Sequence, residues 1–162
     1  MPKKICNILS VFIFLFLAVI AAAMFVPKIA GFDQYAVLSG SMEPDIKVGA
    51  IVYERAFKPE ALKEGTVITY KLSEGTLVTH RVVSIDWKNK TVVTKGDANN
   101  TTDAAEVSFD QITGVYAFIL PYLGYISIYA KTPVGIAVIC GILILIILLN
   151  FIPEILESET AV

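Results

Sequence analysis

The sequence predicts a small, mostly-β domain held between an N-terminal and a C-terminal transmembrane helix. The 162 residues are 56% hydrophobic, and their mean hydropathy of +0.69 is too apolar for an ordinary soluble domain. Residues 5–27 and 132–153 contain no charged side chain, and each stretch is long enough to cross a hydrocarbon core of ~30 Å as a helix. Between them, short runs of β-forming residues alternate with turn-forming residues, which is typical of a β domain.

The first apolar stretch is predicted to be a transmembrane signal anchor over residues 5–26, after a cytoplasmic N-terminus at residues 1–4. Lys3 and Lys4, followed by an apolar run and the alanines at 21–23, also fit a cleavable signal peptide. The uncharged run continues past these alanines and is long for a signal peptide. The pattern therefore favours an uncleaved anchor.

The middle of the chain, residues 27–115, is predicted to form a small β-barrel of irregular strands. The expected strands are runs rich in β-branched and aromatic residues. They lie at residues 35–39, 50–55, 66–72, 77–85, 91–95 and 111–117. The connections between them are rich in glycine, lysine, asparagine and aspartate, which favour turns.

The segment at residues 116–131 holds four of the seven tyrosines of the chain. If this segment is helical, the residues that share one face are Tyr122, Tyr125, Ile126 and Tyr129. An ordinary core helix has the same spacing. The neighbouring span favours a membrane-associated segment instead, with its tyrosines at the level of the lipid headgroups.

The second apolar stretch is predicted to be a transmembrane helix over residues 132–153, followed by an acidic tail at residues 154–162. Cys6 and Cys140 both fall inside the predicted spans, and no disulfide between them is expected. The charges that flank the spans give almost no orientation, because the middle segment is longer than the loops to which the positive-inside rule applies.

A candidate nucleophile, Ser41, follows the first expected strand. Gly40 allows a backbone angle that a residue with a Cβ resists, and Pro44 ends regular structure soon afterwards. Ser41 is therefore expected at an exposed bend, where its hydroxyl is well placed to attack a carbonyl. Because Ser-Gly-Ser also occurs in many solvated loops, this interpretation depends on finding a base for the serine.

The chain has one histidine, His80, and it lies in the expected strand 77–85. Strand alternation predicts one face with Val78, His80, Val82 and Ser84, and the other with Leu77, Thr79, Arg81, Val83 and Ile85. An imidazole between valines is oriented by packing and partly desolvated, which suits a neutral general base. The alternative is a strand histidine whose nitrogens are satisfied by backbone or water.

Two carboxylates, Asp97 and Asp103, lie in the loop at residues 95–103, directly after the expected strand 91–95. Turn-forming residues predict a compact loop here. One carboxylate could accept a proton from Nδ1 of His80 and fix the tautomer that deprotonates Ser41. From the residues alone either aspartate could reach the histidine, and an ordinary polar connection with Asp97 closing an Asx-turn is the alternative.

Taken together, these segments resemble the type I signal peptidases. Residues 39–44 (Ser-Gly-Ser-Met-Glu-Pro) resemble the box that supplies the family's nucleophile. Residues 79–82 resemble the box that supplies the base, and residues 95–103 the box that supplies the acid. Bacterial housekeeping members carry lysine as the base. Histidine at this place resembles the branch shared by the endoplasmic-reticulum catalytic subunit, archaeal enzymes and some Gram-positive enzymes.

The resemblance implies a role for each matched residue. It makes Ser41 the nucleophile, His80 the general base and Asp103 the residue that orients the base. Asp97 takes a supporting role, and Ser39 supplies a hydroxyl that helps the backbone N–H of the nucleophile to form the oxyanion hole. One departure is visible, because alanine stands at position 98 where endoplasmic-reticulum members commonly have asparagine.

The resemblance also implies a function: a membrane-bound serine endopeptidase that cleaves signal peptides from exported preproteins after small residues, through an acyl-enzyme. Its catalytic domain is then expected on the extracytoplasmic side of the cell membrane. The expected partners are secretory preproteins and the lipid bilayer, with the export translocon or auxiliary subunits as further candidates. Two alternatives stay open: a membrane-tethered, non-catalytic β domain that binds peptides, and a membrane serine hydrolase with other substrates.

Other classes of function find no support in the residues. The net charge of −2, without a basic cluster, gives no sign of a nucleic-acid partner. The cysteines and the single histidine have no metal-ligand spacing, and no glycine loop has phosphate-binding form. We therefore expect neither a metal nor another cofactor.

Overall fold

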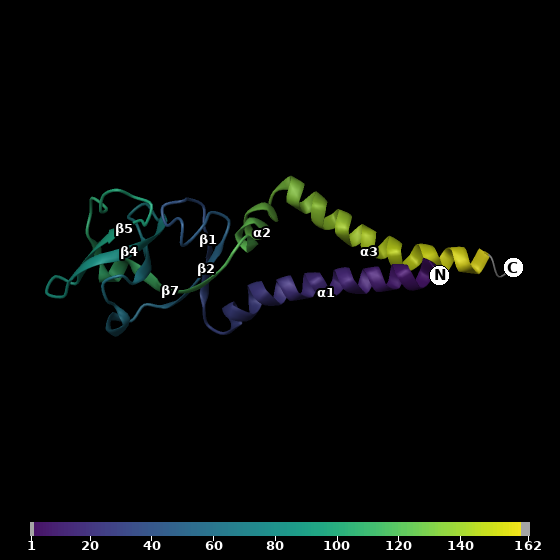
Figure 1. Ribbon diagram of the computed structural model, residues 1–162, viewed down its shortest axis with the longest axis horizontal. Coiled ribbons are helices and arrows are strands. Elements are labelled where there is room, and N and C mark those ends of the chain that lie inside the picture. Colours follow the sequence, from purple (N-terminus) through teal and green to yellow (C-terminus); the bar gives the residue numbers. More distant parts are fainter. Residues whose placement is uncertain (1, 160–162) are drawn as a thin grey trace. The chain divides into compact units, whose positions relative to one another are not determined.

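The computed structural model describes residues 2–159, and the chain divides into two compact units (Figure 1). One unit comprises residues 27–127 and contains the strands. The other unit joins the two ends of the chain and is helical. Its helices are α1 (Pro2–Ile29), α3 (Pro133–Glu159) and the end of α2 (Leu123–Tyr129).

Seven strands form one antiparallel sheet in the spatial order β1-β2-β7-β3-β4-β5-β6. The strands are β1 (Asp33–Ala36), β2 (Ile51–Ala56), β3 (Val67–Lys71), β4 (Leu77–Asp86), β5 (Thr91–Lys95), β6 (Val107–Ser108) and β7 (Ile112–Leu120). Two short 3₁₀ turns, η1 (Pro59–Ala61) and η2 (Phe109–Gln111), lie in the connections. This architecture confirms the prediction of a mostly-β domain with an apolar helix at each end.

The predicted strands are all present; β5 has the predicted ends, and the ends of the others are shifted. β1 ends at Ala36, earlier than expected, so the residues from Val37 to the candidate nucleophile are irregular. β7 continues to Leu120, so the first part of the predicted membrane-associated segment is a strand that pairs with β2. β6 was not predicted, because a pairing of two residues leaves no alternation to detect in the sequence.

The predicted alternation of β4 holds only in its first half. His80 and Val82 are buried, as expected for residues that share a face. The pairing of β4 with β5 shifts register between Val82 and Ser84. Because a bulge inserts one extra residue, the later side chains change face. Ser84 is exposed, whereas Ile85 packs against the same cluster as Val82, so the prediction for these two residues was wrong.

Two groups of buried side chains form the core of the β unit. The larger group lies among strands β3 to β7 and consists of Leu62, Ile68, Tyr70, Val82, Val92, Val107, Phe109 and Ile112. The smaller group consists of Met42, Ile46, Val52 and Val67. Two members of the smaller group come from the irregular segment after β1, so burial of their side chains fixes the turn that carries Ser41.

The helical unit contains both predicted spans. The stretches Lys3–Ile29 and Pro133–Ile152 are long and apolar enough to cross a membrane. Within this unit, Ser10 on α1 donates a hydrogen bond to the side-chain oxygen of Asn150 on α3, at 3.4 Å. α3 runs on to Glu159, so the described part of the predicted acidic tail is helical, and residues 160–162 lie outside the described residues.

Candidate active site

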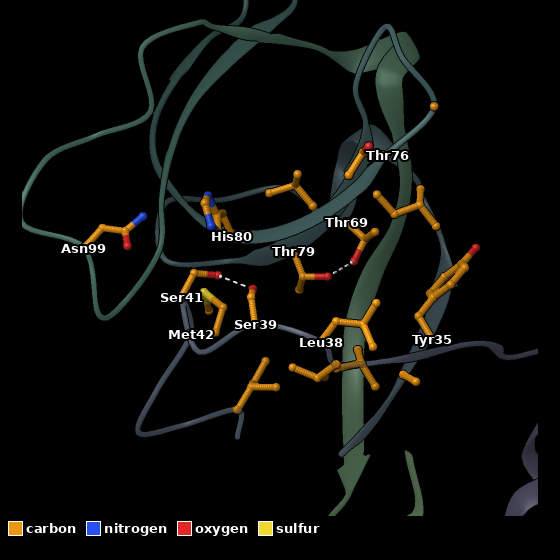
Figure 2. A pocket seen from close by; sticks show the side chains of 17 residues that line it. Tyr35, Leu38, Ser39, Ser41, Met42, Thr69, Thr76, Thr79, His80 and Asn99 are labelled. Atoms are coloured by element: carbon orange, nitrogen blue, oxygen red, sulfur yellow. Dashed lines mark hydrogen bonds between the residues drawn. The ribbon is translucent and has the colours of Figure 1, made fainter. Parts of the chain in front are cut away.

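A pocket of about 690 Å³ opens between the irregular segment after β1, the strands β3 and β4, and the loop after β5. Figure 2 shows its lining from close by, with Ser39, Ser41 and His80 turned toward the same space. The remaining lining is mostly apolar and includes Val37, Leu38, Met42, Ile46, Val52 and Val78. The candidate nucleophile and the candidate base therefore share one pocket.

Ser41 is held in a turn by backbone hydrogen bonds on both sides. The N–H of Glu43 donates to the carbonyl of Gly40 at 3.0 Å, and the N–H of Ile46 donates to the carbonyl of Met42 at 2.9 Å. The carbonyl of Ser41 itself accepts from the N–H of Ala98 at 2.9 Å. This bond ties the turn to the loop at residues 95–103, which we call the acid loop. Because the main chain is fixed in this way, the side chain of Ser41 is held toward the pocket.

The hydroxyl of Ser39 lies 3.5 Å from that of Ser41 (Figure 2). The two residues are separated by Gly40, and both side chains line the pocket. An oxyanion that forms on a substrate carbonyl beside Ser41 is therefore within reach of a second hydroxyl as well as of the Ser41 backbone N–H.

His80 is 7% exposed, and its Nδ1 lies 2.6 Å from Oδ2 of Asp103. An ionised carboxylate can only accept, so the ring must carry a proton on Nδ1. In the neutral imidazole this leaves the lone pair on Nε2. Of the two aspartates in the acid loop, the structure brings Asp103 to the histidine.

Asp103 has further partners that hold its carboxylate in place. The hydroxyl of Thr94 donates to Oδ2 at 2.6 Å, and the hydroxyl of Tyr70 donates to it at 3.2 Å. Burial raises the pKa of Asp103, but the hydrogen bonds from Thr94, His80 and Tyr70 outweigh it, so the net pKa lies below its ordinary value. The carboxylate is therefore ionised wherever the protein is folded near neutral pH.

Asp97, the other aspartate of the loop, pairs with Arg81 instead. The guanidinium donates from Nε to Oδ1 at 2.8 Å and from Nη2 to Oδ2 at 2.6 Å, which is a two-point contact. Arg81 also donates to Oδ2 of Asp45 and to the carbonyl of Gly65, each at 3.1 Å. This cluster links the acid loop to the turn that follows the candidate nucleophile.

Three residues that support the site were not predicted as site residues: Tyr70, Thr94 and Gly96. A Cβ at Gly96 would lie 2.7 Å from the carbonyl oxygen of Ser41 and 3.0 Å from Nε2 of His80, so only glycine fits. The Gly at a strand end was a usable signal for a close approach. Tyr70 and Thr94 gave no such signal, because they read as ordinary strand residues.

A hydroxyl and an imidazole at one pocket, with a carboxylate on the imidazole, are the groups that serine hydrolases use, and here they belong to a chain with two apolar spans. Comparison with known proteins gives the class more closely. Signal peptidase I W of Bacillus subtilis (strain 168) is 35% identical over 130 residues, which cover 74% of this chain and 68% of that protein.

The signal peptidase complex catalytic subunits SEC11C of Rattus norvegicus and Homo sapiens are each 26% identical over 125 residues, which cover 68% of this chain and 65% of theirs. No protein-family model matches the chain. The identity to the Bacillus protein over two thirds of its length is decisive. The chain belongs to the type I signal peptidase family and is a membrane peptidase.

Proposed function

We propose that this chain is a serine endopeptidase that cleaves signal peptides from exported preproteins after small residues, through an acyl-enzyme. The observation that carries the proposal is the contact of 2.6 Å between Asp103 and Nδ1 of His80, with His80 and Ser41 lining one pocket. Ser41 is the nucleophile, His80 the general base and Asp103 the group that orients the base.

The reaction follows from these positions. Nε2 of His80 takes the proton of the Ser41 hydroxyl while the oxygen attacks the scissile carbonyl carbon. The backbone N–H of Ser41 and the hydroxyl of Ser39 stabilise the oxyanion. His80 then gives its proton to the leaving amine, and an ester to Ser41 remains. Water, deprotonated by His80, hydrolyses this ester and restores the free serine.

The substrate is bound as an extended strand beside the segment from β1 to Ser39. β1 is an outer strand of the sheet, so one of its backbone edges pairs with no other described strand. Leu38 is 75% exposed at the pocket and offers apolar surface to an incoming chain. Main-chain pairing sets the register, and the pocket takes small side chains one and three residues before the cut.

Asp97 supports the site by holding the acid loop through Arg81. The two spans anchor the enzyme in the cell membrane with its β unit on the extracytoplasmic side, and the bilayer is its first partner. The rat and human relatives are catalytic subunits of a complex. Auxiliary subunits or the export translocon are accordingly further candidate partners.

The test uses the full chain in detergent with a model preprotein, and mass spectrometry maps the cut. We expect cleavage after a small residue by the natural protein. A folded Ser41→Ala variant should lose about 10⁶-fold in turnover, as expected when the nucleophile of a serine protease is removed. Substantial cleavage by that variant would rule out Ser41 as the nucleophile.

A serine-directed covalent reagent separates the alternatives. Labelling of Ser41 together with preprotein cleavage supports the proposal. Labelling without cleavage indicates a membrane serine hydrolase with other substrates, and the absence of labelling indicates a non-catalytic peptide-binding domain.

A further inference from the structure

Glu54 is a buried carboxylic acid that the mechanism does not use. It lies on β2 and is 1% exposed. One of its oxygens, Oε1, accepts a hydrogen bond from the hydroxyl of Thr69 on β3. The other, Oε2, has no hydrogen-bond partner among the described residues. A buried acid with one oxygen unpaired costs free energy, so its presence needs an explanation.

The central strand β7 leaves room for this side chain. β7 lies between β2 and β3 in the sheet, and Gly114 on β7 pairs with Thr69. A Cβ at Gly114 would lie 2.5 Å from Oε2 of Glu54. Glycine therefore lets the carboxyl of Glu54 pass across β7 and reach the next strand.

The hydrogen-bond chain continues from Thr69 into the substrate pocket. The hydroxyl of Thr69 lies 2.6 Å from that of Thr79 on β4, as the dashed line in Figure 2 shows. Thr69 and Thr79 both line the pocket that contains Ser41 and His80. An otherwise largely apolar wall thus carries a hydroxyl that is connected to a buried acid.

Counting the hydroxyl protons shows in which direction the hydrogen bonds of this series are donated. Thr69 has one hydroxyl proton and donates it to Oε1 of Glu54. Its oxygen can then only accept from Thr79, so the proton of Thr79 is directed at Thr69 and is not available to a ligand. The hydroxyl of Thr79 offers lone pairs to a ligand. This direction of donation is fixed when the carboxyl of Glu54 is ionised, because a carboxylate can only accept. Burial raises the pKa of Glu54 to about 7, so the carboxyl is ionised at pH 8.5.

We propose that the hydrogen-bond chain Glu54–Thr69–Thr79 makes the hydroxyl of Thr79 a hydrogen-bond acceptor in the pocket wall. This acceptor selects preproteins that place a serine in the pocket, because the serine hydroxyl can donate to it. The inference deepens the proposed function and rests on it. Thr79 is the specificity-determining residue because its side chain lines the pocket that takes the substrate. Glu54 is a positioning residue that acts through Thr69.

The first test compares two peptides that differ only in the residue for this pocket, serine or the equally large, apolar 2-aminobutyrate. They are made in two series, one and three residues before the cut. At pH 8.5 we expect kcat/KM in one series to be about fivefold higher for serine, the value of one neutral hydrogen bond. The ratio should fall to about one in Thr79→Val and persist in Thr79→Ser.

The ratio of two substrates cancels the amount of folded enzyme and the ionisation of His80. The matched control is Thr91→Val on β5, whose hydroxyl bonds Glu106 and which does not line the pocket. Its ratio should equal that of the natural protein. A serine preference that survives Thr79→Val in both series overturns the inference while the proposed function stands. If neither peptide is cleaved by the natural protein, the proposed function fails and the inference with it.

The second test addresses the direction of the chain. O-methylserine accepts a hydrogen bond but cannot donate one, and norvaline is its apolar isostere. At pH 8.5 the natural protein should gain nothing from O-methylserine over norvaline. Glu54→Met fills the same space without an acceptor, so Thr69 no longer has to donate to position 54 and Thr79 is free to donate to the substrate. The ratio of kcat/KM for O-methylserine over norvaline should therefore rise about fivefold. Thr69→Val breaks the same chain and serves if Glu54→Met does not fold. An unchanged ratio in a folded variant excludes Glu54 as the positioning residue.

Discussion

Two neighbouring side chains on β4 decide how the acid loop is used. Successive residues of a strand point to opposite faces, so His80 and Arg81 diverge. His80 takes Asp103, and Arg81 takes Asp97. One loop therefore supplies a carboxylate to each face of the strand. This geometry supports different roles for the two aspartates, one at the imidazole and one as a structural tie.

Asp103→Asn tests the first of these roles. The amide keeps the volume of the carboxylate, but its NH₂ group donates where an acceptor is needed, and the imidazole loses the partner that fixes its tautomer. We expect kcat to fall by about 10⁴-fold with little change in melting temperature. Steady-state kinetics on a model preprotein and thermal melting in detergent measure the two effects.

Asp97→Asn is the matched control in the same loop. It weakens the two-point contact with Arg81, which is about one third exposed, so we expect a loss of about 1 kcal/mol in stability and a smaller loss of kcat than in Asp103→Asn. If Asp97→Asn is stable and inactive while Asp103→Asn is nearly normal, the two roles must be exchanged.

At Gly96 the acid loop contacts the turn that carries Ser41. The Ser41 carbonyl accepts from Ala98, and the main chain at Gly96 passes so close to Ser41 and His80 that a Cβ has no room. Turn and loop are therefore positioned by each other. The same close packing of elements explains why Gly114 on β7 lies where Glu54 crosses toward β3.

Gly96→Ala should separate this positioning from stability. The new methyl group meets a backbone oxygen, so the turn or the loop must shift. A displacement of about 1 Å between reacting groups costs about 10²-fold in rate, and we expect a loss of kcat of that order. Asn100→Ala in the same loop, at an exposed residue that does not line the pocket, controls for a general effect on folding. Unchanged kcat in Gly96→Ala would show that the close approach is not needed.

Glu54 should make the stability of the β unit depend on pH. Burial, with a further contribution from the charge of Asp33, raises the pKa of Glu54 to about 7 from 4.5. A raised pKa means that the folded state holds the proton more tightly than the unfolded state. The contribution of Glu54 to the free energy of unfolding is therefore fully present below about pH 4.5. It is lost as the pH rises to about 7, and the total loss is about 3 kcal/mol.

Glu54→Gln removes this titration. The difference in melting temperature between pH 5 and pH 8 should be smaller in the variant than in the natural protein, and the variant should be the more stable of the two at pH 8. Thermal melting in one detergent at both pH values measures this. Equal pH dependence in the two proteins would mean that Glu54 does not titrate in this range.

The chain joins a β unit that carries the candidate chemistry to a helical unit with two spans. Each span is nearly free of charge and is stabilised by apolar surroundings, which the bilayer supplies.

Membrane integration and orientation are tested together. We expect the protein to stay in the membrane fraction after alkaline carbonate extraction. Trypsin added to the outside of intact protoplasts should cut the exposed β4–β5 connection at Lys88 or Lys90, if the β unit is extracytoplasmic. A cut that appears only in inside-out vesicles would reverse the proposed orientation.

The sequence by itself determined the helices, most of the strands and the three segments that supply the candidate site residues, because each of these depends on residues close together in the sequence. Charge-free runs predict spans, alternation predicts strands, and the Ser-Gly-Ser, His-Arg and Gly-Asp segments point to a site. Tertiary structure decided which groups meet. The carboxylate that reaches His80, the bulge that turns Ile85 inward and the passage of Glu54 across β7 all depend on strand register. The alternation of side chains along one strand does not show which distant segments pack together or where a bulge interrupts the pairing.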